Sequence, residues 1–441
     1  MKIGPAFGDY IKLEKGQRHP SSSGKNYSAR GYLLPLILII ATCLILARLF
    51  VLQIVKGSDY RLLSDSNRTK TIPIHAPRGI IFDRDGIPLV FNVPGFREVP
   101  DGTSSNGDKI RLLEKNEALK LISGGTSLEI DSLRNYPYKE IFSHVLGYTG
   151  QISKEELGQK EFSYYKGGEL IGKFGIEKKY EGLLRGTDGK ELAEVNSMGK
   201  VIRKLGTEDP IPGQNITLTL DVALQEAAFD AAKSVKKGAV IVSNPKGEIL
   251  TLVSKPAFDS NFFTMGEGYS AEQNSSYVSV LEILSDLENQ PLLNRAIAGT
   301  YPPGSTFKLI TAAAGLENKV IDENFTVEDT GILRVGTFSF GNWYFMQYGK
   351  TEDGGVNVVK GIKRSNDIFF YKLAELIGVD NLSIFAEKFG LGKKLGIDLD
   401  GEQKGTVPTQ KWKKSIIGEN WYLGDTYHYG IGQGFLLTTP L

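Results

Sequence analysis

The stretch Tyr301-Pro302-Pro303-Gly304-Ser305-Thr306-Phe307-Lys308 decides how this sequence is to be interpreted. Its prolines and glycine end the preceding element, and the apolar run that continues to Leu316 predicts a helix. A serine at such a point is ordinarily an N-cap. Ser305 and Lys308 are also three residues apart, so they share one helix face. Apolar neighbours would desolvate Lys308 and lower its pKa, and a neutral amine there could accept the proton of the Ser305 hydroxyl.

The Ser-x-x-Lys spacing alone does not separate catalysis from capping. Most such pairs are a capping serine and a solvated lysine. At Ser305 the pair follows Pro-Pro-Gly and opens an apolar helix, and this context favours the catalytic interpretation there. The same spacing recurs at Ser22/Lys25, Ser163/Lys166, Ser197/Lys200, Ser234/Lys237 and Ser243/Lys246.

Composition limits the classes of function. The 441 residues suffice for two or three domains. The formal net charge of +1 and the lack of a basic patch argue against a nucleic-acid partner. Cys43 is the single cysteine, which excludes a disulfide framework and a cysteine-based metal site. The histidines His19, His75, His144 and His428 lack metal-ligand spacing, so we expect neither a metal nor a cofactor.

Residues 32–55 are apolar and long enough to span a bilayer, which takes about 20 residues. Arg48 lies near one end of this run and can reach the interface. Residues 1–31 are basic and rich in Gly, Ser and Pro, which predicts a cytoplasmic tail and an extracytoplasmic remainder. We therefore expect a single-pass protein of the plasma (inner) membrane. A cleaved signal peptide is the alternative, but the run is long and no clear small-residue cleavage site follows.

The segment after the membrane, residues 56–212, carries no evident catalytic constellation. A strand at 79–82 followed by Asp85-Gly86 predicts a hairpin. A helical patch is expected near 110–122, and a strand at 215–220 leads into a helix at 222–234. On physical grounds alone this segment is a spacer or an interaction domain.

The C-terminal half supplies a second polar cluster. Residues 238–254 predict a hairpin with an Asn-Pro-Lys-Gly turn. Helices expected at 357–363 and 368–377 are joined by Arg364-Ser365-Asn366-Asp367. Side chains on such a turn can point into a cleft. Ser365 and Asp367 could instead simply cap the second helix.

Taken together, these features resemble the class B penicillin-binding proteins, membrane-anchored D,D-transpeptidases that cross-link peptidoglycan. Residues 76–84, Ala-Pro-Arg-Gly-Ile-Ile-Phe-Asp-Arg, are similar to the start of the family's pedestal (dimerisation) domain, and residues 175–186 to its later part. Ser305-Thr306-Phe307-Lys308 and Ser365-Asn366-Asp367 match the first two catalytic motifs. Residues 365–371 and 424–434 resemble the elongation class more than the division class.

The resemblance implies an α+β fold. An elongated, mainly-β pedestal domain would span residues 56–212. A partial transpeptidase domain, with a central sheet flanked by helices, would span residues 213–441.

The resemblance also implies roles for individual residues. Ser305 would be the acylated nucleophile and Lys308 its proton acceptor, while Ser365 would relay a proton to the leaving amine. Asp367 would order Lys308 and Ser365. The implied ligands are D-Ala-D-Ala stem peptides and β-lactams, and the implied partner is a SEDS-type glycosyltransferase. The residues expected to contact substrate are Asn366, Gly432, Gln433 and Gly434.

One departure from the family pattern concerns its third motif, Lys-Thr/Ser-Gly. The nearest match, Gly349-Lys350-Thr351-Glu352, precedes the second motif and lacks the final glycine. In relatives the third motif follows the Gly-Gln-Gly segment, so we expect a C-terminal truncation and an incomplete site. The alternatives are a non-catalytic scaffold for a membrane glycosyltransferase and a β-lactam sensor or β-lactamase.

Overall fold

The computed structural model describes residues 30–98, 111–124, 126, 128–196, 201–265, 269–270, 275–349 and 353–441. Residues 1–29 of the expected tail, and Lys350-Thr351-Glu352, lie outside the described residues. The chain forms two units: Met1–Thr71 with Leu192–Gly206, and Ile72–Glu191 with Thr207–Leu441. The second unit contains every predicted site residue.

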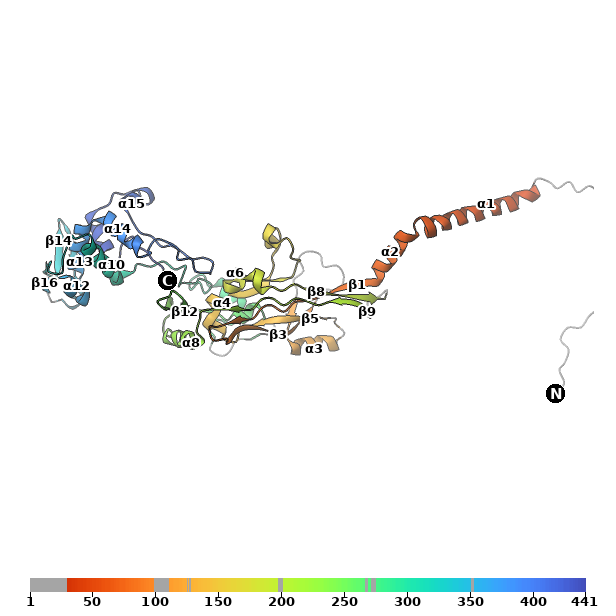
Figure 1. Ribbon diagram of the computed structural model, residues 1–441, viewed down its shortest axis with the longest axis horizontal. Coiled ribbons are helices and arrows are strands. Elements are labelled where there is room, and N and C mark those ends of the chain that lie inside the picture. Colours follow the sequence, from red (N-terminus) through yellow and green to blue (C-terminus); the bar gives the residue numbers. More distant parts are fainter. Residues whose placement is uncertain are drawn as a thin grey trace, which may run out of the picture. The chain divides into compact units, whose positions relative to one another are not determined.

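The described part of the first unit begins with an apolar helix. Helix α1 (Arg30–Phe50) continues through the π-helical turn η1 (Val51–Val55), and α2 (Gly57–Arg68) follows (Figure 1). The span Pro35–Val55 has a mean hydropathy of 2.6, and none of its side chains is buried. By length and composition it can cross a membrane, which agrees with the span predicted at 32–55.

A three-stranded sheet contains strands from distant parts of the sequence, in the order β1 (Thr69–Ile74), β8 (Gly189–Val195) and β9 (Val201–Glu208). Within the first unit, Glu194 pairs with Arg68 and, at 2.6 Å, with Arg203. Strand β8 pairs with β1 on one side and with β9 on the other. This pairing explains why residues 192–206 group with the N-terminal segment.

A five-stranded sheet organises the early part of the second unit. Its order is β10-β2-β3-β4, with β5 also paired to β3. Strands β3 and β5 are antiparallel from Phe91 opposite Asn135 to Glu98 opposite Leu128. The strands of this part are β2 (Ile81–Phe82), β3 (Pro88–Glu98), β4 (Arg111–Leu113), β5 (Leu128–Asn135), β6 (Tyr148–Gln151), β7 (Leu170–Phe174) and β10 (Ile216–Thr217).

The turn between β2 and β3 confirms the predicted hairpin. Buried Asp83 accepts hydrogen bonds from the backbone of Asp85 at 2.9 Å and of Ile87 at 2.7 Å. Gly86 has φ +83°, a value that suits glycine. The local sequence thus determines both the turn and the reversal of the chain.

Short helices connect these strands. The patch predicted at 110–122 is divided: Arg111–Leu113 pairs with β3, and the helix begins only at Lys115. Strand pairing overrides helix propensity for those first residues. The helices are α3 (Lys115–Ser123), η2 (Lys139–Phe142), α4 (Ser143–Leu146), α5 (Lys154–Leu157), η3 (Lys160–Phe162), α6 (Gly175–Lys179), α7 (Glu181–Leu184) and α8 (Val222–Ala231).

The predicted hairpin at 238–254 is confirmed as β11 (Gly238–Ser243) and β12 (Ile249–Lys255). Asn244 forms its turn by accepting from the backbone of Lys246 at 3.0 Å and of Glu248 at 3.1 Å. In the described part of the chain these two strands pair only with each other. Within the described residues, β11 and β12 are the strands that correspond to the expected central sheet.

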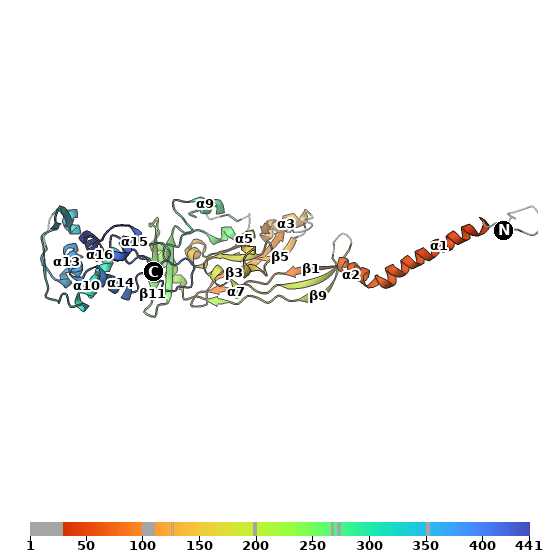
Figure 2. The ribbon, with the colours of Figure 1, turned by 90° about the horizontal axis from the view of Figure 1, so that it is seen from above.

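Helices α10 (Lys308–Glu317), α13 (Asp367–Ile377), α14 (Val379–Lys388) and α16 (Leu423–Gly430) share one apolar core (Figures 1 and 2). Helix α13 is the centre of this core, because Phe369, Phe370, Leu373 and Ala374 are fully buried. A helix that is apolar on most sides is expected to be enclosed by others. The mixed α+β class is confirmed.

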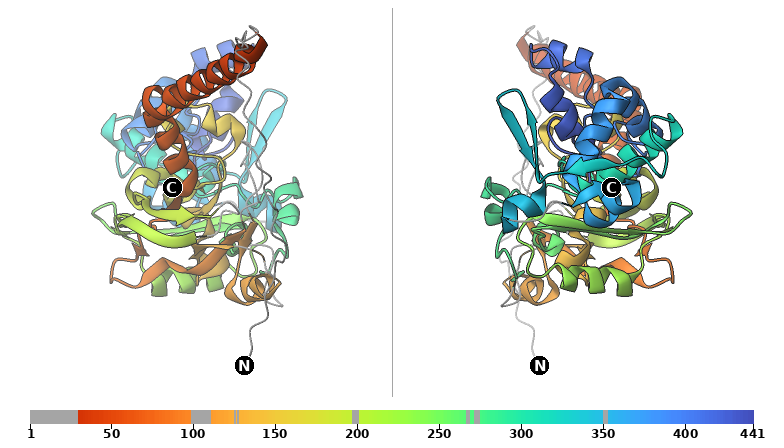
Figure 3. Two further views of the ribbon diagram at one scale, coloured as in Figure 1. Left: turned by 90° about the vertical axis from the view of Figure 1, so that its right-hand side faces the viewer. Right: turned by 90° about the vertical axis from the view of Figure 1, so that its left-hand side faces the viewer.

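The remaining elements surround these helices. The hairpin of β14 (Ile332–Val335) and β15 (Phe338–Gly341) projects as a narrow ribbon in Figure 3. Its base is held where Phe340 packs against Tyr371 and Tyr427. The others are η4 (Ser260–Phe263), α9 (Val280–Ser285), η5 (Gly304–Phe307), β13 (Val327–Asp329), α11 (Trp343–Tyr348), β16 (Gly354–Val356), α12 (Val358–Arg364) and α15 (Gln410–Ile416).

Candidate active site

Ser305 lies in the 3-10 turn η5, which runs directly into α10. The residue preceding the turn is Pro303, and no side chain caps the turn or the helix after it, so the alternative that Ser305 is an N-cap is wrong. The Ser305 side chain is exposed. The turn therefore presents a serine hydroxyl to solvent at the start of a buried helix.

Gly432 supports this turn from the neighbouring chain. The Gly304 N–H donates to the Gly432 carbonyl at 2.8 Å. Gly432 has φ +73°, and a Cβ there would lie 2.2 Å from the Gly304 carbonyl oxygen. Nearby, the rings of Phe307 and Tyr429 stack with centroids 5.5 Å apart. Only glycine allows so close an approach, so Gly432 fixes the turn that carries Ser305.

Lys308 is buried, with a relative exposure of 2%. Its Nζ donates to the Ser365 carbonyl oxygen at 2.8 Å, to Ser365 Oγ at 3.1 Å and to Asp367 Oδ1 at 2.6 Å. Three acceptors therefore match the three donors of an ammonium group. Burial lowers the pKa of Lys308, and the charge and hydrogen bond of Asp367 oppose this shift only in part.

The turn Ser365-Asn366-Asp367 joins α12 to α13. Ser365 ends α12 with φ +51°, in the left-handed region. Asn366 caps α13, because its Oδ1 accepts from the Phe369 N–H at 2.9 Å. The alternative that Ser365 and Asp367 cap the second helix is therefore wrong, and both side chains are free to bind Lys308. Asp367 also accepts from the Trp343 N–H at 2.9 Å.

Asn366 is fully buried, which differs from the substrate contact expected for it. Its Nδ2 donates to Asp329 Oδ2 at 2.6 Å and to Asp353 Oδ2 at 3.2 Å. The Tyr344 hydroxyl lies within hydrogen-bond distance of both of these carboxylates. Asn342 links the same network to the motif, since its Nδ2 donates to Asp329 and its Oδ1 accepts from the Asp367 N–H. Asn366 is thus a buried residue whose hydrogen bonds hold the Ser365-Asn366-Asp367 turn in place.

Sequence reasoning missed this supporting network of Asp329, Asn342, Tyr344 and Asp353. These residues lie outside the second motif, between Asp329 and Asp353, and their residue types are usually solvated. The one available signal is Asp329-Thr330-Gly331, a turn-forming sequence, in which the Gly331 N–H donates to Asp329 at 2.7 Å. That signal predicts a turn and not a partner for Asn366.

The geometry brings together three of the four predicted catalytic side chains: Lys308, Ser365 and Asp367. A buried amine with a lowered pKa can accept a proton, and the Ser365 hydroxyl beside it can pass one on. Of the predicted substrate contacts, Gly432 is buried, whereas Gln433 and Gly434 are exposed. Among the residues described, no group of three His, Cys, Asp or Glu side chains could hold a metal ion.

Comparison with known families gives two matches. Residues 238–441 match the penicillin binding protein transpeptidase domain, and residues 104–218 match the penicillin-binding protein dimerisation domain. Together they cover strands β4, β5 and β10 of the five-stranded sheet and the Ser305 region.

Two curated relatives are peptidoglycan D,D-transpeptidases named MrdA. The protein from Escherichia coli K12 is 33% identical over 98% of this chain and 73% of its own length. The protein from Acinetobacter baumannii is 34% identical over 92% of this chain. The matched region spans 64% of the length of that relative.

Two solved structures are similar in fold. The complex of Helicobacter pylori penicillin-binding protein PBP2 with MreC has a TM-score of 0.69 and 30% identity, covering 84% of this chain and 74% of that chain. A peptidoglycan synthase complex that coordinates polymerization and crosslinking has a TM-score of 0.65 and 29% identity, covering 93% and 75%.

Proposed function

Because the chain belongs to the class B penicillin-binding proteins of the elongation-type MrdA family, we propose that it cross-links peptidoglycan as a serine D,D-transpeptidase. Ser305 is the acylated nucleophile in this proposal. The observation that carries it is the buried Lys308 amine, which contacts Ser365 Oγ at 3.1 Å and Asp367 at 2.6 Å.

The reaction has two acyl-transfer steps. The Ser305 oxygen attacks the carbonyl carbon between the two D-alanines of a stem peptide, and its proton passes to neutral Lys308. The C–N bond then breaks, and the leaving D-alanine amine takes a proton through the Ser365 hydroxyl. An amine of a neighbouring stem peptide attacks the resulting ester, which forms the cross-link and returns Ser305 to its hydroxyl form. Asp367 keeps Lys308 and Ser365 in position.

The Ser305 turn would supply a hydrogen-bond donor that stabilises the tetrahedral oxyanion. The Ser305 N–H is the donor we propose for it, since backbone N–H groups that converge on one point favour developing negative charge. Gln433 and Gly434 are exposed beside the segment that holds the turn, and we propose that they contact the stem peptide. A β-lactam would acylate Ser305 in the same way and stall at the second step.

We assign the pedestal domain to residues 56–212 and the transpeptidase domain to residues 213–441. The family matches at 104–218 and 238–441 support this division. The apolar span Pro35–Val55 supports a single-pass anchor, with the tail in the cytoplasm and the catalytic domain outside. A related protein forms a complex with MreC, and a peptidoglycan synthase complex is similar in fold. We propose a SEDS-type glycosyltransferase as partner.

The test uses the full chain in detergent with a stem pentapeptide that ends in D-Ala-D-Ala and an acceptor amine. We expect release of D-alanine and formation of the cross-linked product, both abolished in Ser305→Ala. Ser234→Ala removes the serine of another Ser-x-x-Lys pair and should leave both products unchanged. Product formation that survives in Ser305→Ala would refute the assignment.

A further inference from the structure

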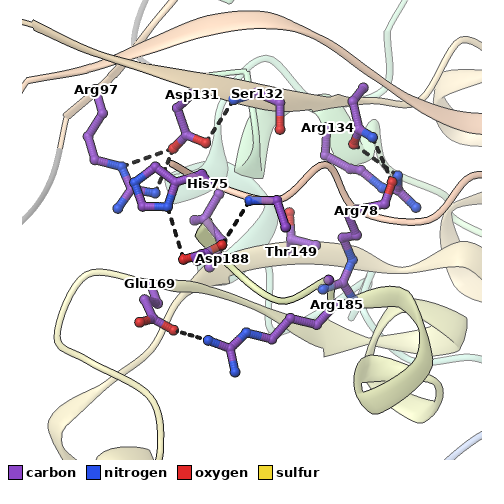
Figure 4. Close-up of a pocket in the computed structure, with 14 residues that line it drawn as sticks. His75, Arg78, Arg97, Asp131, Ser132, Arg134, Thr149, Glu169, Arg185 and Asp188 are labelled. Carbon is purple, nitrogen blue, oxygen red and sulfur yellow. Dashed lines mark hydrogen bonds and ion pairs between the residues drawn. The ribbon is translucent and has the colours of Figure 1, made fainter. Parts of the chain in front are cut away.

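A small polar cavity lies among residues 75–188 of the second unit, away from the Ser305 turn in the sequence. Its volume is about 80 Å³, and four arginines line it: Arg78, Arg97, Arg134 and Arg185. In Figure 4, Arg97 lies at the upper left, Arg78 and Arg134 at the right, and Arg185 below. Guanidinium groups thus approach this space from several directions.

The carboxylates that line the cavity already have partners. Asp131 accepts from Arg97 at 2.6 Å, and Glu169 accepts from Arg185 at 2.6 Å. Asp188 accepts from the Ala76 N–H at 2.8 Å and lies 3.3 Å from His75 Nδ1. Two of the four guanidinium groups, those of Arg97 and Arg185, thus bind carboxylates of the lining. The other two, those of Arg78 and Arg134, bind the buried carboxylate of Glu177.

Arg134 provides a buried donor without a partner. Its side chain has a relative exposure of 3%, with Nε bonded to Glu177 at 2.7 Å and Nη1 to Asn92 at 3.1 Å. Its Nη2 makes no hydrogen bond, and neither does Oγ1 of buried Thr149, which also lines the cavity. Buried donors without acceptors are unfavourable, so a group that accepts hydrogen bonds is favoured in this space.

We propose that this cavity binds a small oxyanion, the size of one carboxylate or phosphate group, through Arg134 Nη2 and Thr149 Oγ1. A guanidinium group is a rigid donor that matches both kinds of oxyanion, and it cannot ligate a cation. The volume exceeds the space that a single water molecule needs. This site is independent of the acylation chemistry proposed for Ser305.

The test is calorimetric titration of the full chain in detergent with inorganic phosphate and with acetate, at an ionic strength held constant with sodium chloride. We expect saturable binding of at least one of these anions. Thr149→Val keeps the shape but removes the hydroxyl, and it should weaken binding about tenfold. Thr251→Val is the matched control, because Thr251 Oγ1 is also buried without a partner but lies in β12, outside the cavity.

A second variant and a peptide pair keep the proposal open to refutation. Arg185→Gln changes a partly exposed lining residue and should also weaken binding. Acetyl-alanyl-alanine and its C-terminal amide distinguish a carboxylate carried by a peptide from a free anion. Binding of the peptide acid but not of its amide supports the site and identifies the ligand as a peptide carboxylate. Binding of phosphate or acetate alone supports the site and identifies the ligand as a free anion. No saturable binding, equal binding of the amide, or equal loss in Thr149→Val and Thr251→Val would overturn it.

Discussion

At the scale of single residues, the environment of Lys308 controls the proposed chemistry. Burial lowers its pKa, whereas Asp367 raises it. Only the neutral amine can accept the Ser305 proton, so acylation should be slow below this pKa and rise as the pH increases through it. The Lys308 pKa is therefore the quantity that a pH profile of acylation measures.

Replacing Asp367 by Asn should shift that profile to lower pH. The change removes the charge that favours the ammonium form, so the midpoint of the acylation rate should fall by about 1–3 pH units. The measurement is the rate constant for acylation by a chromogenic β-lactam at a series of pH values. Asp398→Asn, which removes an exposed carboxylate bonded to Tyr180, is the control. An unchanged midpoint in Asp367→Asn would contradict the role given to Lys308.

Local motifs predicted the pair Ser305 and Lys308 but not the buried hydrogen bonds that support the site. The spacing of Ser305 and Lys308 lies within one helical turn, so the sequence was sufficient to predict the pair. The partners that enclose the Lys308 amine, Ser365 and Asp367, come from a distant turn. The bonds from Asn366 to Asp329 and Asp353 join residues far apart in the chain. Polar groups without a motif give no sign of such partners. The substrate contact expected of Asn366 came from its place in the family's second motif.

At the scale of elements, the turn η5 depends on a close contact with the chain after α16. A side chain at Gly432 would meet the backbone oxygen of Gly304, which cannot move aside as a flexible side chain could. The position of Ser305 therefore depends on a glycine that touches no substrate in this account.

Gly432→Ala should destabilise the protein and slow acylation of Ser305. Positive φ and the 2.2 Å approach together should cost about 1–3 kcal/mol or more. Gly418→Ala is the matched control: its φ is also positive, at +84°, but no atom lies within 4 Å of the added Cβ. Thermal melting measures the loss of stability, and the rate of β-lactam acylation measures the effect on Ser305. Equal losses in the two variants would show that the contact with Gly304 has no special role.

Elements with strong local signals were predicted within a few residues. The 238–254 hairpin has its own turn chemistry at Asn244, and α13 follows an apolar run. The helix expected from Ser305 begins instead at Lys308, after a 3-10 turn. The strand expected at 215–220 is reduced to Ile216–Thr217, because only those residues pair with β2. Boundaries that depend on pairing could not be inferred from the local sequence.

At the scale of the whole molecule, a buried ion network contributes to the second unit. Glu177 is fully buried and binds Arg78 at 2.6 Å and Arg134 at 2.7 Å. Burial alone would raise the pKa of Glu177, but the two arginines outweigh it and the pKa is lowered. A lowered carboxyl pKa stabilises the fold above the unfolded pKa of about 4.3, and this contribution is lost as the pH falls through the folded value.

Glu177→Gln should therefore lower stability by about 3–5 kcal/mol at neutral pH, because it leaves two buried guanidinium groups without their shared carboxylate. The difference from the parent protein should narrow as the pH falls through the Glu177 pKa. Calorimetric melting of both proteins over this pH range measures the difference in stability. Glu208→Gln breaks an exposed pair with Lys190 and should leave the stability almost unchanged, because solvent screens such a pair. A constant difference at all pH values would contradict the network's role.

The apolar span could be predicted from the sequence, since it follows from composition and length. The α+β class was implied by the resemblance of the motifs to those of the family. The grouping of Leu192–Gly206 with the N-terminal segment could not. It depends on the pairing of β8 with β1 on one side and with β9 on the other, and the register between distant strands has no local signal.

The most direct test of the central claim, that Ser305 is the acylated nucleophile, is mass spectrometry of the full chain after incubation with benzylpenicillin. The account predicts one covalent adduct per chain, located on the peptide that contains Ser305 and lost in Lys308→Ala even where that variant remains folded. An adduct on another serine, or full acylation without the Lys308 amine, would contradict it.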